Sequence, residues 1–271
     1  MLSKRTSLSA ALASIPDGAI VALGGNTFHR GPGAAVHELV RQQKRGLDIV
    51  KTAGAYDVDL LCAAGCVRQV SAGYVGYESI FGLAPSYRRS VEAGNVVAAE
   101  HACYTVISGM RAAIQGVPFM PVAGMTGSDL PAARDFRWIA DPYTGVTVVV
   151  VPALQPDVAI IHVHESDELG NARIIGSLFE DVLMAQSGRR VILTAERIVD
   201  GAAFLSDPSL AAISSLYVDA VVEAPNGAWP FGCASLYEPD FDFMAGLVRS
   251  GKSDQSATAW IDEHLLQPSA V

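Results

Sequence analysis

Short runs rich in β-branched residues alternate with Ala- and Leu-rich segments, and this alternation limits the possible folds more than any other feature of the chain. Residues 19–23 and 158–164 are typical of buried strands, whereas residues 32–43 repeat apolar side chains at helical spacing. Neighbouring parallel strands need a crossover between them, and that crossover is usually a helix. The pattern therefore predicts an α/β fold with a largely parallel sheet.

The same pattern gives the predicted elements. The strands cover residues 19–23, 47–52, 70–75, 96–99, 146–151, 158–164, 190–195 and 218–223. The helices cover residues 7–14, 32–43, 87–93, 105–115, 179–186 and 202–205. Residues 140–147 are predicted as a loop or hairpin, and residues 227–241 as an irregular segment that either covers a pocket or interface or packs as a surface loop. Because no repeat or linker divides the chain, we expect one domain over residues 1–250 and a peripheral tail over residues 251–271.

Composition and the lengths of the apolar runs exclude two kinds of partner, nucleic acids and membranes. Hydrophobic residues make up 50% of the 271 residues, charged residues 17%, and the formal net charge is -9. Such an acidic chain lacks the basic surface that binds phosphate backbones, so we expect no nucleic-acid partner. The longest apolar run, residues 146–154, is about half the length of a spanning helix and contains Pro152, so we expect no membrane span. Burial against partner subunits is the expected reason for the low charge.

The cysteines indicate a reducing compartment, and two histidines raise the question of a metal site. The four cysteines are Cys62, Cys66, Cys103 and Cys233. They are too few for a disulfide framework, and no second Cys or His pair completes a zinc site with Cys62 and Cys66, so we expect a cytoplasmic protein. His162 and His164 share one face of a strand, which suits either a metal site or a core strand reaching a loop. We expect no metal.

Two glycine-containing loops follow apolar segments. Gly24 and Gly25 end a predicted strand just before a helix, an arrangement that serves either as an anion or oxyanion site or as a tight turn. The dinucleotide fingerprint and the Walker loop are both absent from it. Gly127 and Ser128 offer a second set of backbone donors or a second turn.

A carboxylate, an imidazole and a thiol occur close together at Glu100, His101 and Cys103. A Cys/His pair can generate a thiolate nucleophile, but sequence neighbours need not be spatial partners. No nucleophile elbow of the Gly-x-Ser-x-Gly type accompanies them. The alternatives are a catalytic thiolate and a structural cysteine.

The order of five segments resembles the first (A, or α) subunit of the family I CoA-transferases, and most closely the glutaconate CoA-transferase type. Residues 20–30 are similar to the glycine loop after the family's first strand, and residues 149–162 to its central strand pair. The other similar segments are residues 112–121, 167–173 and 218–228. The resemblance covers about residues 5 to 245.

This resemblance implies a Rossmann-like α/β fold, an open, mostly parallel sheet with flanking helices. It implies a companion B (β) subunit, an α2β2 or larger assembly, a coenzyme A thioester as substrate and no permanently bound cofactor. In these transferases the thioester is attacked by a glutamate of the B subunit, and CoA then passes to a second carboxylate. The A subunit supplies the facing wall and donors for the thioester oxygen. The matching residues are Gly24, Gly25, Asn26, Gly127 and Ser128.

Three assignments stay open. Arg30 either holds a substrate carboxylate or is a solvated charge, and Glu78 either meets the substrate or is solvated. Some relatives of this type hydrolyse a carbon–carbon bond in ring-derived CoA thioesters of steroid breakdown, and others decarboxylate glutaconyl-type thioesters. The acidic residue of the hydrolases falls near Glu100 to Cys103, where this chain has Cys103. Besides a transferase subunit, the sequence leaves open such a hydrolase or decarboxylase, and a monomeric sugar- or nucleotide-binding module.

Overall fold

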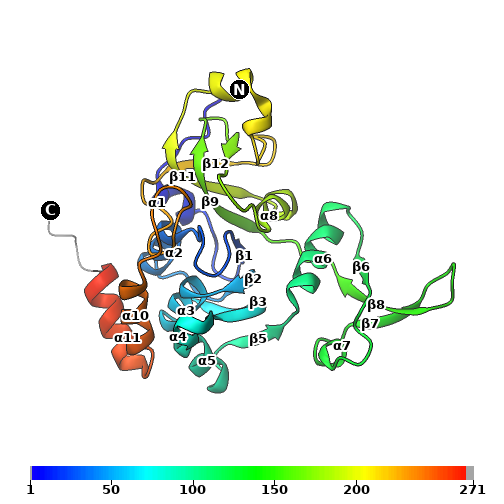
Figure 1. Cartoon of the computed structure of the whole chain (residues 1–271). Helices are drawn as coiled ribbons and strands as arrows, with labels where there is room; N and C mark the ends of the chain where they lie inside the picture. The colour runs from blue at the N-terminus through cyan, green and yellow to red at the C-terminus, as the bar shows by residue number, and fades with distance from the viewer. Residues whose placement is uncertain (1, 267–271) are drawn as a thin grey trace.

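The main sheet has its first strand in the middle. A computed structural model describes residues 2–266 and gives the strand order β12-β11-β9-β1-β2-β3, with β5 next to β3, all parallel (Figure 1). The strands are β1 (Ile20–Leu23), β2 (Leu47–Gly54), β3 (Val67–Tyr77), β5 (Val97–Glu100), β9 (Val158–Ser166), β11 (Val191–Ile198) and β12 (Ala220–Glu223). The short strands β4 (Gly82–Leu83) and β10 (Ala172–Arg173) pair antiparallel with β3 and β9. The expected α/β fold with a mostly parallel sheet is confirmed.

Helices cover both faces of this sheet. The helices of the first half are α1 (Leu8–Ala13), α2 (Gly33–Arg41), α3 (Tyr56–Ala63), α4 (Glu78–Phe81), α5 (Pro85–Glu92) and α6 (Cys103–Ile114). Those of the second half are α8 (Asp181–Ser187), α9 (Ala202–Ser206), the 3-10 turn η1 (Pro208–Leu210), α10 (Phe241–Ser250), α11 (Asp254–Ile261) and the π-helical turn η2 (Asp262–Leu266). None of the helices within residues 2–266 is long and apolar enough to span a bilayer.

Alternating strand side chains divide the core between the two faces. Ile160 of β9 packs into the cluster formed with α1, α2, α3, α10 and α11, while its neighbour Ile161 packs into the cluster formed with α6 and α8. Both side chains are fully buried. A strand that is apolar on both faces must lie in the middle of a covered sheet. The continuous apolar run of β9 therefore explains its central position.

A small lobe projects from the main sheet (Figure 1). It consists of β6 (Phe119–Val122), α7 (Leu130–Ala133), β7 (Arg137–Ala140) and β8 (Thr147–Pro152), and its antiparallel order is β6-β8-β7. The expected hairpin over residues 140–147 joins β7 to β8. The expected central strand pair over residues 149–162 is wrong, because β8 belongs to the lobe and only β9 to the main sheet. Both strands are β-branched runs, and such runs do not indicate their partners.

The C-terminal helices pack on the same face as α3. Trp260 and Ile261 of α11 are buried in the larger core cluster, next to Met244 and Leu247 of α10. The division into a domain over residues 1–250 and a tail over residues 251–271 stays a prediction. Residues 267–271 of that tail lie outside the described residues.

Asp59 joins two helices from a fully buried position. Its Oδ1 accepts hydrogen bonds from the backbone N–H groups of Ser86 (2.8 Å) and Tyr87 (2.9 Å), and its Oδ2 accepts one from the Tyr77 hydroxyl (3.1 Å). It thereby holds the first turn of α5 against α3. Burial raises the pKa of Asp59 to about 6, and these hydrogen bonds only partly oppose the rise.

The raised pKa predicts a pH-dependent stability. Since the folded state holds the Asp59 proton more tightly than the unfolded state does, its contribution is fully present below the unfolded value of 3.8 and is lost as the pH rises through about 6. Asp59→Asn imitates the protonated form and should remove this loss. Between pH 4 and pH 7.5 the free energy of unfolding of the wild type should fall by on the order of 2–3 kcal/mol more than that of the variant. Denaturant titrations at both pH values measure this difference, and parallel pH profiles would contradict it.

Candidate functional site

The candidate site lies where the chain reverses its direction across the sheet. β1 pairs with β2 on one side and with β9 on the other, so the segments after β1 and β9 diverge at their carboxyl ends. Open α/β sheets bind ligands at such a switch point. Four segments meet there: the glycine loop, defined here as Gly24–Asn26 after β1, Thr52 near the end of β2, Cys103 at the start of α6, and Glu180 just before α8.

A buried lysine fixes the carbonyl side of the glycine loop. Lys51 Nζ donates to the Gly24 carbonyl oxygen at 2.7 Å and forms an ion pair with Asp57 Oδ2 at 2.6 Å. Both charged side chains have no exposed area. The other Asp57 oxygen, Oδ1, accepts from the N–H groups of Ala55 (3.0 Å) and Val58 (2.9 Å) at the start of α3. The glycine loop is thus attached to β2 and α3 through charge-assisted hydrogen bonds.

A second buried ion pair fixes the N–H side of the loop. The Gly25 N–H donates to Asp181 Oδ1 at 2.8 Å, and Asp181 Oδ2 lies 2.5 Å from Arg30 Nη1. Arg30 is only 3% exposed and also donates to the carbonyl oxygens of His162 (2.9 Å) and Ser177 (2.8 Å). Neither a solvated charge nor a free substrate-binding cation describes such a residue. Arg30 holds the loop, β9 and the segment before α8 together.

The backbone donors of the glycine loop are all used within the chain. The Gly24 N–H donates to the Ile160 carbonyl oxygen (2.9 Å), the Gly25 N–H to Asp181, and the Asn26 N–H to the His29 carbonyl oxygen (2.9 Å). Our expectation that these N–H groups stabilise an oxyanion is therefore not met by the geometry. Gly25 has a φ of 71°, and a Cβ there would lie 2.4 Å from the His29 oxygen, so this position requires glycine. The loop therefore allows other groups to approach its backbone closely, and it presents the Asn26 side chain.

Thr52 connects the two sides of the candidate site. Its hydroxyl donates to Glu180 Oε2 at 2.7 Å, and its Oγ1 lies 3.5 Å from Asn26 Nδ2. Its carbonyl oxygen accepts from the Cys103 thiol at 3.4 Å. A hydroxyl has one proton, so donation to Glu180 leaves Thr52 Oγ1 as an acceptor toward the Asn26 amide. The carboxylate of Glu180 thereby influences the orientation of Asn26.

The environment of Cys103 favours the protonated thiol. Burial, and then the Glu180 carboxylate, raise the pKa of the Cys103 thiol. A nucleophilic thiolate requires the opposite shift. The side chain remains accessible, and a Cβ on Gly73 of β3 would lie 2.7 Å from its Sγ, so the strand and the thiol are in close contact. Cys103 is a neutral thiol at this site, and its single proton is donated to the Thr52 carbonyl oxygen.

The carboxylates expected from the sequence lie at the margin. Glu78 follows β3, is exposed, and has a φ of 50° with its N–H donating to the Tyr74 hydroxyl at 2.9 Å. Glu100 ends β5 and is also exposed. Each therefore reaches solvent on this chain, and their catalytic roles stay predictions.

His101 does not pair with the Cys103 thiol. Its Nδ1 is 2.9 Å from Thr105 Oγ1, and its Nε2 is 3.1 Å from Arg134 Nη2. Since arginine only donates, Nε2 accepts and the proton is assigned to Nδ1. Burial, and then the Arg134 guanidinium, lower the pKa of His101 to about 4. The neutral imidazole links α6 to the lobe.

Gly127 and Ser128 belong to the lobe, between β6 and α7. The Ser128 N–H donates to the Met125 carbonyl oxygen at 3.2 Å, and its Oγ accepts from the Leu130 N–H at 3.2 Å. These hydrogen bonds are local, and the structure does not bring the two residues to the glycine loop. Their binding role stays a prediction.

His162 and His164 lie in a buried hydrogen-bond network. The ring nitrogens of His162 are 2.9 Å from Thr194 Oγ1 and 2.8 Å from Glu196 Oε1. Ligand atoms of His162, Glu196 and Cys233 lie within 4.8 Å of one another, a spacing that could hold a metal ion. Burial, however, raises the pKa of the Cys233 thiol to about 12, and both His162 nitrogens already have partners. The geometry fits a satisfied core network better than a metal centre.

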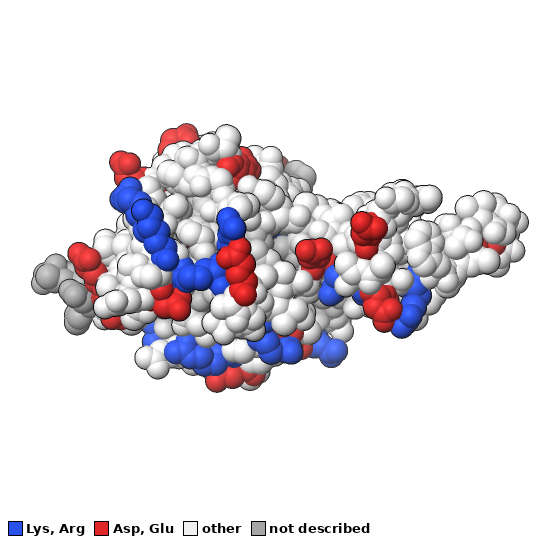
Figure 2. Space-filling model, turned by 90° about the horizontal axis from the view of Figure 1, so that it is seen from below, with Lys and Arg blue, Asp and Glu red and all other residues white. Residues whose placement is uncertain are grey.

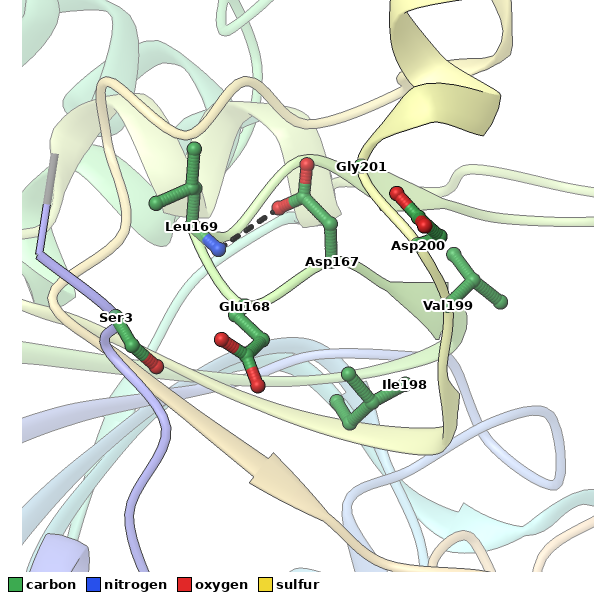
Figure 3. A pocket seen from close by; sticks show the side chains of 8 residues that line it. All are labelled: Ser3, Asp167, Glu168, Leu169, Ile198, Val199, Asp200 and Gly201. Atoms are coloured by element: carbon green, nitrogen blue, oxygen red, sulfur yellow. Dashed lines mark hydrogen bonds between the residues drawn. The ribbon is translucent and has the colours of Figure 1, made fainter.

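An acidic cavity of about 520 Å³ lies outside this region (Figure 3). Asp167 at its wall uses Oδ1 to accept from the N–H groups of Leu169 (2.9 Å), Gly170 (2.8 Å) and Asn171 (2.9 Å). This carboxylate closes its own turn after β9, which is a structural task.

Sequence reasoning missed the residues that hold the site together. They are Lys51, Thr52, Asp57, Glu180 and Asp181. Two signals were available: Lys51 and Thr52 are polar residues at the end of a predicted buried strand, and Glu180 and Asp181 lie at the start of the predicted helix 179–186. Acidic residues in a first helical turn are common, so the second signal is weak.

Comparison with known proteins agrees with this fold. Residues 5–224 match the coenzyme A transferase family. An uncharacterized protein of Archaeoglobus fulgidus is 36% identical over 252 residues, 93% of this chain, and this chain spans 56% of that protein's length. The A subunit of glutaconate CoA-transferase from Acidaminococcus fermentans is 32% identical over 280 residues, 97% of this chain and 88% of the relative.

Solved structures extend the comparison. The crystal structure of glutaconate coenzyme A-transferase from Acidaminococcus fermentans superposes with a TM-score of 0.94, covering 98% of this chain and 90% of that one. The decarboxylase AibA/AibB superposes with a TM-score of 0.87 at 33% identity, covering 98% of this chain and 100% of that one. The chain described here therefore belongs to the coenzyme A transferase family.

Proposed function

We propose that this chain is the A subunit of a CoA-transferase that moves CoA between an acyl-CoA thioester and a carboxylic acid. The observation that carries the proposal is its likeness, over 97% of the chain, to the A subunit of glutaconate CoA-transferase. The site geometry supports it, because the Asn26 amide has a second N–H to donate beside a fixed glycine loop. The neutral Cys103 thiol lies next to it. The Glu180 carboxylate accepts a hydrogen bond from Thr52, which also contacts both residues. A companion B subunit is proposed to supply the attacking glutamate.

The chemistry follows from that division. The companion's glutamate attacks the thioester carbonyl, the C–S bond breaks, and CoA leaves as a thiolate. The thiolate then attacks the resulting anhydride at the glutamyl carbonyl, which forms a glutamyl-CoA thioester and releases the acyl group as a carboxylate. A second carboxylate takes CoA by the reverse steps. Splitting one transfer into two is the advantage of covalent catalysis. This chain contributes a wall and side-chain donors near the thioester oxygen.

We propose an α2β2 or larger assembly in the cytoplasm, without a permanently bound cofactor. The surface of the lobe supports the assembly. Figure 2 shows basic and acidic side chains intermixed on one face, with little charge toward the end of the lobe. The β7–β8 hairpin, residues 137–152, has only Arg137 and Asp141 as charged residues. Trp138 and Tyr143 there are 47% and 94% exposed. Exposed apolar surface of this kind is typical of subunit contacts.

A hydrolase or decarboxylase of CoA thioesters is the second candidate. The likeness to the decarboxylase AibA/AibB favours it, and so does the Glu180 carboxylate, which puts an acidic group beside Cys103. The companion subunit separates the two candidates, since a transferase needs a glutamate there.

Covalent trapping tests the transferase. The complex of this chain with its companion is incubated with acyl-CoA and then with hydroxylamine or borohydride. We expect one modified glutamate per active site, located by mass spectrometry on the companion and not on this chain. Complex treated without acyl-CoA is the control. Turnover of the thioester without any trapped glutamate would contradict the transferase and favour the second candidate.

Alanine variants test the residues of this chain. Cys103→Ala removes the thiol that holds the Thr52 carbonyl oxygen and packs against Gly73, and should lower kcat about tenfold. Glu78→Ala should lower kcat/KM about fivefold, because that carboxylate is predicted to meet the substrate. Steady-state rates of CoA transfer in the assembled complex measure both effects. Full activity in both variants would contradict both site assignments.

Removing one charge from the second ion pair tests the support of the glycine loop. Asp181→Asn keeps an acceptor for the Gly25 N–H but leaves Arg30 buried without a counter-charge. The free energy of unfolding should fall by about 3 kcal/mol. CoA transfer should slow by at least about tenfold, because the loop then loses its fixed position. The exposed Asp242→Asn is the matched control. Unchanged stability in Asp181→Asn would show that the pair does not hold the loop.

A further inference from the structure

A second cavity lies directly beside the glycine loop. It has a volume of about 350 Å³ and opens to solvent. Its lining residues are His29, Arg30, Ile175, Gly176, Ser177, Phe179, Gly232 and Ala234. The walls thus come from the segment after β1, the segment before α8, and the irregular segment after β12. The proposed function does not say which part of the substrate this cavity would hold.

The wall of the cavity adjoins the candidate site. Asn26 and His29 exchange backbone hydrogen bonds of 2.9 and 2.8 Å, so the glycine loop leads straight into the cavity wall. On the opposite wall Phe179 directly precedes Glu180. The rings of His29 and Phe179 face each other at 6.2 Å with an interplanar angle of 22°. A group attached to a thioester near Asn26 would enter this space.

The charges around the cavity are unfavourable to an anion. Its one guanidinium, Arg30, is already neutralised by Asp181 and lies 6.0 Å from the Phe179 ring centre. Ile175, Phe179 and Ala234 add apolar surface. At the margin the Glu180 carboxylate has Thr52 as its hydrogen-bond partner and no ion-pair partner within the described residues. The other ionisable side chain of the wall, His29, stacks its ring on Phe179. A carboxylate placed here would be desolvated without a free guanidinium and repelled by Glu180.

We propose that this cavity receives the acyl group of the CoA thioester and selects uncharged acyl groups over those that end in a carboxylate. The proposal rests on the proposed function, because it takes the thioester to bind at the glycine loop. Phe179 and Glu180 are its specificity-determining residues. Phe179 supplies apolar surface and an aromatic face, and Glu180 supplies the repulsive charge against the wrong substrates.

Two unreactive thioethers of equal length test the selection. S-pentyl-CoA and S-(4-carboxybutyl)-CoA differ by a terminal carboxylate, and neither can transfer CoA. Their dissociation constants are measured by calorimetry with the complex of this chain and its companion subunit. We expect S-pentyl-CoA to bind at least about 30-fold more tightly. Equal binding of the two thioethers, or tighter binding of S-(4-carboxybutyl)-CoA, would overturn the proposal. A cation supplied to the cavity by the companion subunit would give the same result and would overturn it as well.

Charge variants on one loop locate the selection. Phe179→Arg adds a cation to the cavity wall and should reduce the preference for S-pentyl-CoA by at least about tenfold. Leu178→Arg adds the same charge at the neighbouring residue, which is 40% exposed and does not line the cavity, and should leave the preference within about twofold. Phe179→Leu keeps the wall apolar and should retain the preference. Equal effects of both arginines would overturn the assignment to this cavity.

The kinetic counterpart separates this inference from the proposed function. Pentanoyl-CoA and glutaryl-CoA are compared as CoA donors to acetate, and Glu180→Gln should raise the relative kcat/KM of glutaryl-CoA several-fold. Transfer that favours glutaryl-CoA in the wild type would overturn the cavity proposal and leave the transferase intact. Selective thioether binding without any CoA transfer would overturn the transferase and leave the cavity proposal intact.

Discussion

The ion pair between Arg30 and Asp181 is the interaction on which the candidate site depends most. It ties the glycine loop, the end of β9 and the start of α8 to one another, because Asp181 also accepts from Gly25 and Arg30 also donates to His162. A buried pair of this kind adds little net stability, since desolvation offsets the attraction. The pair instead fixes the geometry of the site. Each charged group has one low-energy position, and these positions fix that of the glycine loop.

That constraint changes the chemistry available to the glycine loop. With its N–H groups directed at Ile160, Asp181 and His29, the loop cannot also cradle an oxyanion with its backbone. Donors toward a reacting carbonyl must then come from side chains such as Asn26, whose amide has a second N–H, or from the companion protein. The Glu180 carboxylate acts on Asn26 through the Thr52 hydroxyl, and its charge also raises the pKa of the nearby Cys103 thiol.

Local patterns predicted the elements, and contacts distant in sequence decided the site. The strand expected at residues 158–164 is β9 (Val158–Ser166), and the helix expected at 32–43 is α2 (Gly33–Arg41). Side-chain periodicity suffices for such elements. The lobe was missed because β8 reads like any other buried strand. The partner of Gly25 was missed because Asp181 is 156 residues away, and nothing near either residue indicates the other.

Distance along the chain also explains why the buried ion pair of Arg30 was not expected from the sequence. A charged residue in a glycine-rich loop invites a functional role when its surroundings are unknown. Its φ of 52° and 3% exposure instead follow from a chain that turns inward to meet Asp181. Because Asp181 neutralises Arg30, the adjoining cavity has no unpaired guanidinium in its wall, and the Glu180 carboxylate follows directly after the wall residue Phe179. The pair that holds the loop therefore also bears on which acyl groups the site can accept.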